Sequence, residues 1–124
     1  MLDVICYIDG FNLYHGLKSK GWRKYYWLDL WSLTERFLRP GQKLIEVVYC
    51  TAKVKADTGA LGRQMVFIDA LTAHRPGVKV LYGHYLTKEM QCFKCGNTYN
   101  RPEEKMTDVN IACRLLTDAM DNRF

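Results

Sequence analysis

An aspartate and an asparagine stand directly after the first apolar run of the sequence. Residues 4–8 are Val-Ile-Cys-Tyr-Ile, and Asp9, Gly10 and Asn12 follow them closely. A carboxylate in this place could bind a hard divalent cation such as Mg²⁺ through oxygen, and the amide could hold a ligand or a phosphate. Aspartate, glycine and asparagine are also common turn formers. The local sequence therefore leaves a metal site and a simple turn both open.

A second carboxylate, Asp108, follows Thr107 at the start of a helical pattern. Thr107 is expected to cap this helix and to place Asp108 in its first turn, where an acidic side chain stabilises the helix dipole. The same side chain could instead supply a second metal ligand beside Asp9, with Lys105 meeting a phosphate. Both interpretations of Asp108 stay open at the level of the residues.

Cys92 and Cys95 form a Cys-x-x-Cys pair followed by glycine, which is the pattern of a zinc knuckle. A closed zinc site needs four ligands, and the nearest further candidate, His84, lies in an expected strand. One alternative is a β-hairpin with two free thiols. Another is a symmetric dimer in which two such pairs share one Zn²⁺ ion. The pair does not open a helix after the first strand, which disfavours a thioredoxin-type redox role.

Residues 21–31, GWRKYYWLDLW, combine aromatic and basic side chains. A surface of this kind can stack unpaired bases and follow a nucleic-acid backbone. The alternative is a segment whose rings pack on the core while its lysines face the solvent, and we expect this second arrangement.

The elements that must position these residues alternate between strands and helices. We expect strands at residues 2–9, 44–50 and 78–86, and helices at residues 11–18, 28–38, 58–74 and 107–120. The first strand is expected to be buried on both faces, and Asp29 to cap the second helix. Such alternation indicates a parallel sheet covered by helices. Ligands bind outside the carboxyl ends of such strands, where Asp9 lies.

Length and composition predict one domain over residues 1–124, with a formal charge of +5 that favours a polyanionic partner such as nucleic acid. The apolar runs are too short to span a membrane. Five cysteines without a signal peptide indicate the reducing cytoplasm. Three of these cysteines, Cys6, Cys50 and Cys113, are expected to be buried as small apolar side chains.

The segments YIDGFNLYHG (7–16) and EEKMTDVNIA (103–112) together resemble the NYN domains, specifically the LabA-like branch of the PIN-like ribonuclease superfamily. Arg63-Gln64 resembles the same branch, and the likeness covers essentially the whole chain. It implies an α/β fold, a Rossmann-like three-layer PIN-like domain with a mainly parallel sheet. It also implies hydrolysis of RNA phosphodiesters with Mg²⁺ or Mn²⁺ as cofactor.

The same resemblance implies the roles of individual residues. Asp9, Asn12 and Asp108 match the positions around the metal, with Asp9 and Asp108 as ligands and all three as catalytic residues. Lys105 and Arg63 would contact the phosphates of the RNA. Clustered carboxylates suit this chemistry because bound metal ions polarise the phosphate and activate water.

Two departures from the family pattern lower the expected activity. Relatives continue with a strand and an acidic loop where this chain stops at Phe124, and the position of Arg114 is often acidic. We therefore expect an incomplete metal site, a C-terminally incomplete domain with a Cys-x-x-Cys hairpin at about 87–101, and little nuclease activity. Without the further strand, residues 4–8 would form an open edge, which predicts a homodimer. A non-catalytic RNA-binding or regulatory module is the alternative function.

Overall fold

A computed structural model of the chain describes residues 1–54 and 59–124, and of residues 85–87 and 102–105 only the backbone is described. In chain order the elements are β1 (Leu2–Asp9), α1 (Gly10–Ser19), the 3₁₀ turn η1 (Arg23–Tyr25), α2 (Leu30–Glu35), β2 (Gln42–Ala52), α3 (Ala60–His74), β3 (Val78–Gln91), β4 (Thr98–Lys105) and α4 (Thr107–Met120). All seven elements expected from the periodicity are present. The expected start of the third helix, Thr58, lies outside the described residues.

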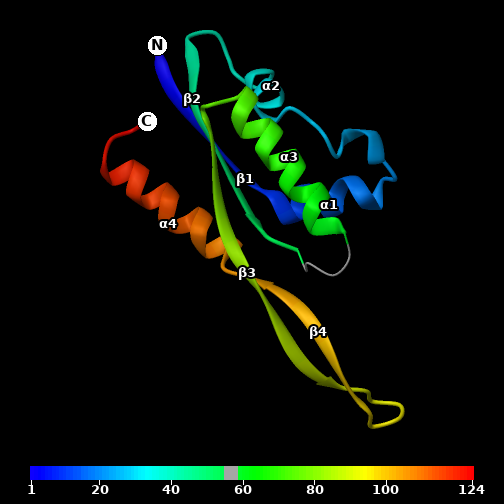
Figure 1. The fold of residues 1–124 in the computed structure, drawn as a ribbon. Helices are drawn as coiled ribbons and strands as arrows, with labels where there is room; N and C mark the ends of the chain where they lie inside the picture. The colour runs from blue at the N-terminus through cyan, green and yellow to red at the C-terminus, as the bar shows by residue number, and fades with distance from the viewer. Residues whose placement is uncertain (55–58) are drawn as a thin grey trace.

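The sheet has the strand order β1-β2-β3-β4 (Figure 1). β1 pairs with β2 and β2 with β3 in parallel, while β3 and β4 are antiparallel. The protein is therefore an α/β structure with a three-stranded parallel sheet, which is compatible with a Rossmann-like fold. None of the helices in residues 1–54 and 59–124 combines the length and apolar character needed to cross a membrane.

β2 is the buried centre of the sheet, and β1 lies at its edge. Val47, Val48 and Cys50 of β2 have no exposed surface, whereas Leu2 of β1 is 71% exposed and the rest of that strand is at most half-buried. The expectation that residues 2–9 are buried on both faces is wrong. An unbroken apolar run marks a strand, but its place in the sheet depends on which strands pair.

Alternate side chains of β2 face two different layers of helices, because successive residues in a strand point to opposite faces. Val47 and Tyr49 belong to the main core, together with Leu30 of α2 and Ile68 of α3. Leu13 of α1 packs against the same cluster. α4 covers the opposite face and contacts β1, β2 and β3 (Figure 1).

A cluster of charges around two buried carboxylates holds α4 on its face of the sheet. Arg114 forms ion pairs with Glu46 of β2 and with Asp118, and Arg123 binds the same two carboxylates at 2.7 and 3.0 Å. The Tyr7 hydroxyl of β1 donates to Asp118 at 2.7 Å. The family resemblance implied that Arg114 replaces an acidic residue, but in this structure Arg114 holds the helix that carries Asp108.

Two expectations about helix ends have opposite outcomes. Asp29 caps α2 as expected, since its Oδ1 accepts the N–H groups of Trp31 and Ser32 at 3.1 and 3.3 Å. Thr107 does not cap α4, because Met106 occupies the N-cap position in a left-handed conformation with φ of 78° and makes no side-chain cap.

Cys113 is exposed on α4, so the expectation of burial is wrong for this cysteine.

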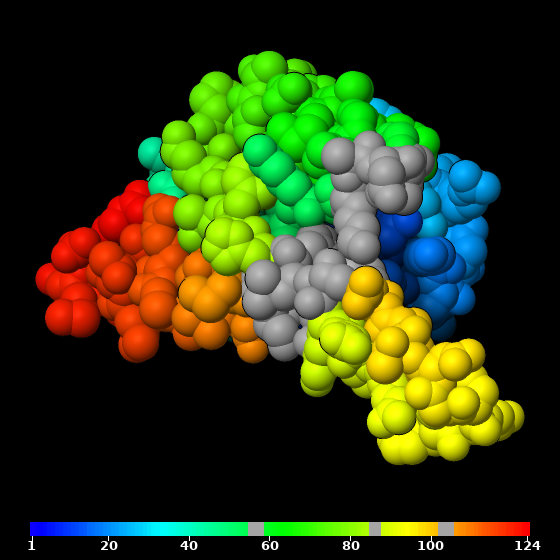
Figure 2. All heavy atoms as spheres, turned by 60° about the horizontal axis from the view of Figure 1, so that its bottom comes forward, coloured from blue at the N-terminus to red at the C-terminus, as the bar shows by residue number. Residues whose placement is uncertain are grey.

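The third strand is longer than its periodicity suggested and forms half of a hairpin. β3 leaves the sheet after Gly83 and continues to Gln91, pairing with β4 from His84↔Lys105 to Gln91↔Thr98. The hairpin projects from the body of the molecule in both views (Figures 1 and 2). Its tip, residues 92–97, holds the Cys-x-x-Cys pair.

Candidate functional site

Asp9 ends β1 and is the N-cap of α1, which places its carboxylate at the carboxyl end of a parallel strand. Its Oδ1 accepts the backbone N–H of Asn12 at 3.1 Å, and its Oδ2 accepts the side-chain Nδ2 of Asn12 at 3.0 Å. The turn interpretation and the site interpretation are thus compatible. The cap fixes the carboxylate, and each oxygen keeps a lone pair for a further partner.

Gly10 allows the ring of Tyr49 to lie against the start of α1. A Cβ at position 10 would stand 2.7 Å from atoms of that ring. Burial raises the pKa of the Tyr49 hydroxyl, a hydrogen bond with Thr51 lowers it, and the negative charge of Asp9 raises it further. Tyr49 is therefore a neutral hydroxyl near Asp9 at physiological pH.

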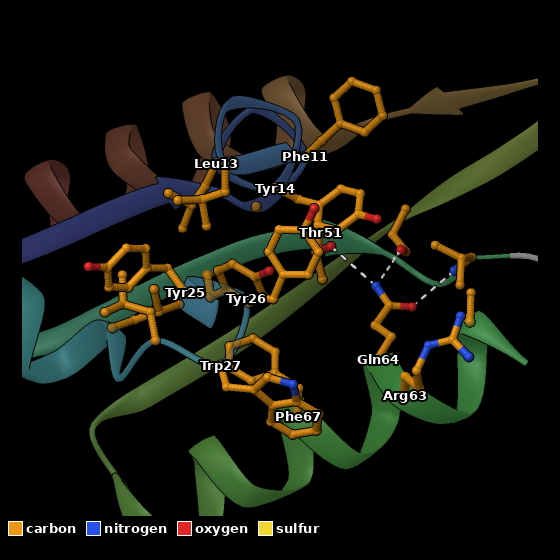
Figure 3. A pocket seen from close by; sticks show the side chains of 18 residues that line it. Phe11, Leu13, Tyr14, Tyr25, Tyr26, Trp27, Thr51, Arg63, Gln64 and Phe67 are labelled. Atoms are coloured by element: carbon orange, nitrogen blue, oxygen red, sulfur yellow. Dashed lines mark hydrogen bonds between the residues drawn. The ribbon is translucent and has the colours of Figure 1, made fainter. Parts of the chain in front are cut away.

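A pocket of about 200 Å³ opens beside this strand end, between α1, the segment before α2, the end of β2 and α3. Its lining is mainly apolar, and seven of its eighteen residues are aromatic (Figure 3). The rings come from Phe11, Tyr14, Tyr25, Tyr26, Trp27, Tyr49 and Phe67. The Tyr14 and Tyr26 rings are 5.1 Å apart, and those of Trp27 and Phe67 are 5.8 Å apart, edge to face. Such a pocket offers flat apolar surfaces to a planar ligand.

The aromatic segment at residues 21–31 is only partly packed as expected. Leu28 and Trp31 do contact the core. Tyr25 and Trp27, however, are 41% and 55% exposed and line the pocket, so the expectation of a wholly core-packed segment is wrong for them. The sequence signalled these rings as a possible stacking surface, but nothing local indicated that α3 would supply the facing ring of Phe67.

Gln64 joins α3 to the end of β2. Its Nε2 donates to the carbonyl oxygen of Ala52 at 2.9 Å and to Thr51 Oγ1 at 3.5 Å, and its Oε1 accepts the N–H of Val54 at 3.0 Å (Figure 3). The side-chain amide of Gln64 therefore links α3 to the end of β2 beside the pocket. Arg63, the preceding residue, is exposed and also lines the pocket, so it presents a cation at the rim.

Asp108 lies in the exposed first turn of α4, as expected, and its Oδ1 accepts the N–H of Val109 at 2.9 Å. The helix start is fixed to β3 by Asn110, whose Nδ2 donates to the carbonyl oxygen of Tyr82 at 3.3 Å. Asp9 and Asp108 thus begin helices that lie on opposite faces of the sheet. The side chain of Lys105 is outside the described part of the structure.

Metal ligands are sparse in the described part of the chain. Residues 1–54 and 59–124 contain no group of three or more His, Cys, Asp or Glu side chains placed to hold one ion. Mg²⁺ does not require such a group, because it usually binds one or two carboxylates and completes its shell with water and substrate phosphates. The partly exposed Asp9, with free lone pairs on both oxygens, fits that weaker mode of binding.

No family model, curated protein or solved structure matches this chain. The site is defined by its own geometry. It consists of the Asp9 carboxylate held by Asn12 at a strand end, the aromatic pocket beside it, and Arg63 at the pocket rim.

The remaining candidates lie elsewhere. Cys92 and Cys95 are at the tip of the hairpin. His15, His74 and His84 are all exposed, and His15 packs against the Phe11 ring at 4.2 Å.

Proposed function

We propose that this chain is a PIN-like domain of the NYN type, LabA-like branch, that binds single-stranded RNA and hydrolyses it with Mg²⁺ or Mn²⁺ in the cytoplasm. The three-layer, Rossmann-like arrangement of that family is part of the proposal. The observation that carries it is the carboxylate of Asp9, held by Asn12 at the carboxyl end of β1 and next to the aromatic pocket. Ligand sites of parallel α/β sheets lie at such strand ends.

Asp9 is the proposed primary metal ligand, with Asp108 as the second carboxylate. When bound, the metal would polarise the phosphate and lower the pKa of its water. Asn12 keeps both Asp9 oxygens oriented, and the neutral hydroxyl of Tyr49 adds no second negative charge beside them. This limits repulsion of an anionic RNA backbone near Asp9.

The pocket and its rim supply the binding of RNA. The aromatic rings can stack an unpaired base, an interaction worth about 1–3 kcal/mol per base. Arg63, which lines the pocket, would contact a phosphate of the same nucleotide or its neighbour, and Lys105 is proposed for a second phosphate. Stacking and charge together favour single strands, because the bases of a duplex are not free to enter the pocket.

The test of catalysis is cleavage of a fluorescent single-stranded RNA in the presence of Mn²⁺. We expect slow cleavage by the native chain and none by Asp9→Asn, because the amide is a poor ligand for a hard cation. Asp3→Asn is the matched control, since Asp3 is an exposed aspartate on the other end of the same strand. Equal cleavage by the native chain and Asp9→Asn would contradict the assignment.

A second function, RNA binding without cleavage, is favoured by two observations. Asp9 already has a structural role as the cap of α1, and the described residues provide no three-ligand metal group. In that case the affinity for RNA would be the same in EDTA as in Mn²⁺, and no Mn²⁺-dependent cleavage would occur.

The pocket can be tested apart from catalysis. Trp27→Ala should weaken binding of single-stranded RNA about 5- to 160-fold, which corresponds to the loss of one stacked base. Trp22→Ala is the control, because Trp22 is exposed to a similar extent, 51% against 55%, and does not line the pocket. Equal affinities of the two variants would remove the pocket from the RNA-binding surface.

A further inference from the structure

The tip of the projecting hairpin is a tight turn that contains both cysteines of the pair. The Cys92 N–H donates to the carbonyl oxygen of Asn97 at 2.8 Å, and the Gly96 N–H donates to the carbonyl oxygen of Cys92 at 2.9 Å. Gly96 has a φ of +72°, a left-handed conformation that favours glycine. The turn therefore brings the ends of the Cys-x-x-Cys-Gly segment together in a defined geometry.

The pKa of the Cys92 thiol is lowered within this turn. The main causes are the backbone N–H groups of Cys95 and Lys94, and the Cys95 side chain adds to the effect. Two cysteines in one tight turn make up half of a tetrahedral four-cysteine zinc site.

The hairpin cannot complete this site with the histidine that the sequence suggested. His84 pairs with Lys105 at the base of the hairpin, whereas Cys92 is at the tip. At ~3.3 Å per residue, eight residues of strand separate them by about 26 Å. Zn–N bonds are ~2.1 Å long, so His84 is excluded as a ligand. No third ligand lies near the pair among the described side chains.

The tip also exposes apolar surface that a second copy could cover. Phe93, between the two cysteines, is 106% exposed, and Tyr99 is 50% exposed. None of the described side chains from Lys88 to Arg101 is buried, so the hairpin has no core of its own. A two-stranded hairpin without a core is only marginally stable. A metal cross-link between two hairpin tips would stabilise both hairpins.

We propose that two copies of this chain share one Zn²⁺ ion, bound by Cys92 and Cys95 of each copy in a tetrahedral four-thiolate site. Four thiols release four protons to the solvent as four Zn–S bonds form. The resulting centre carries two negative charges, and the Lys94 of each copy supplies a compensating positive charge. The two Phe93 rings are covered in the contact between tips.

The hairpins project from the body, so the tips can meet while the two bodies remain apart (Figure 2). The zinc site is incomplete in one chain, and for that reason the metal and the dimer are a single proposal. It does not depend on the proposed ribonuclease function, because the site at Asp9 belongs to the body of the protein.

The test measures zinc content and mass on the same purified chain, by metal analysis and sedimentation equilibrium. We expect one zinc per two chains in a dimer, and monomers after EDTA treatment that re-form dimers when zinc is restored. Cys92→Ser should lose both zinc and dimer. Cys113→Ser is the control, because Cys113 is an exposed thiol on α4.

Circular dichroism should be unchanged in Cys92→Ser, since the tip does not contribute to the core. Phe93→Ser should weaken the zinc-dependent dimer at least about 5-fold, as expected when a buried aromatic contact is lost from an interface. One zinc per monomer, no bound zinc, a Cys92–Cys95 disulfide in the freshly purified protein, or a dimer that persists in EDTA would each overturn the proposal.

Discussion

The ion pairs of Arg114 hold α4, the helix that carries Asp108, and their contribution to stability can be measured. The side chains of Glu46 and Asp118 are only 8% and 3% exposed, and Arg114 pairs with both. Arg114→Met keeps an apolar stem but leaves two buried carboxylates to share Arg123. Removing one partner of a buried pair costs about 3–5 kcal/mol.

We expect a loss near the lower limit, ~3 kcal/mol, because Tyr7 and Arg123 keep their hydrogen bonds to the carboxylates. The measurement is the free energy of unfolding from urea denaturation at neutral pH. Arg36→Met is the control, since Arg36 is exposed at the end of α2, and it should change this free energy by at most ~0.5 kcal/mol.

A double variant separates an unpaired charge from lost packing. Adding Glu46→Gln to Arg114→Met removes one of the stranded carboxylates, so part of the lost stability should return, about 1 kcal/mol or more. The reasoning is refuted if Arg114→Met costs less than ~1 kcal/mol, or if the second substitution makes the protein still less stable. Either result would mean that water or a rearranged α4 solvates these carboxylates.

Two further predictions concern local contacts. Gly10→Ala should destabilise the protein by about 1–3 kcal/mol because of the clash with Tyr49, whereas Gly16→Ala in the same helix meets no atom within 4 Å and should be neutral or stabilising in urea unfolding. The hydrogen bond from Arg75 holds the pKa of Asp29 at about 2. The stability from Asp29 is therefore present above pH ~4 and lost as the pH falls towards 2, so Asp29→Asn should flatten the pH dependence of Tm in that window; an unchanged slope would contradict this.

The sequence by itself determined the local elements. β1 and α4 begin and end where the apolar periodicity placed them, at residues 2–9 and 107–120. The cap at Asp29 and the strand-end position of Asp9 were equally local, since both depend on residues within a few positions. Short-range spacing and hydrogen-bonding capacity were sufficient for these predictions.

The tertiary structure decided what those elements do together. Pairing made β1 an edge strand, and the long hairpin carried Cys92 away from the sheet. The contacts of Glu46 with Arg114 and Arg123 join residues 68 and 77 positions apart. A glutamate inside an apolar strand gives no local sign of its partners, because they come from α4 and from the residues that follow it.

The aromatic pocket also depends on tertiary contacts between segments that lie far apart in the sequence. Trp27 and Phe67 meet only because α1, the segment before α2 and α3 all pack on one face of β2. Periodicity identifies an apolar face but not the element that will cover it. The sequence therefore supplied the carboxylate, the aromatic rings and the thiol pair, and the packing of helices on the sheet decided which of these residues share a site.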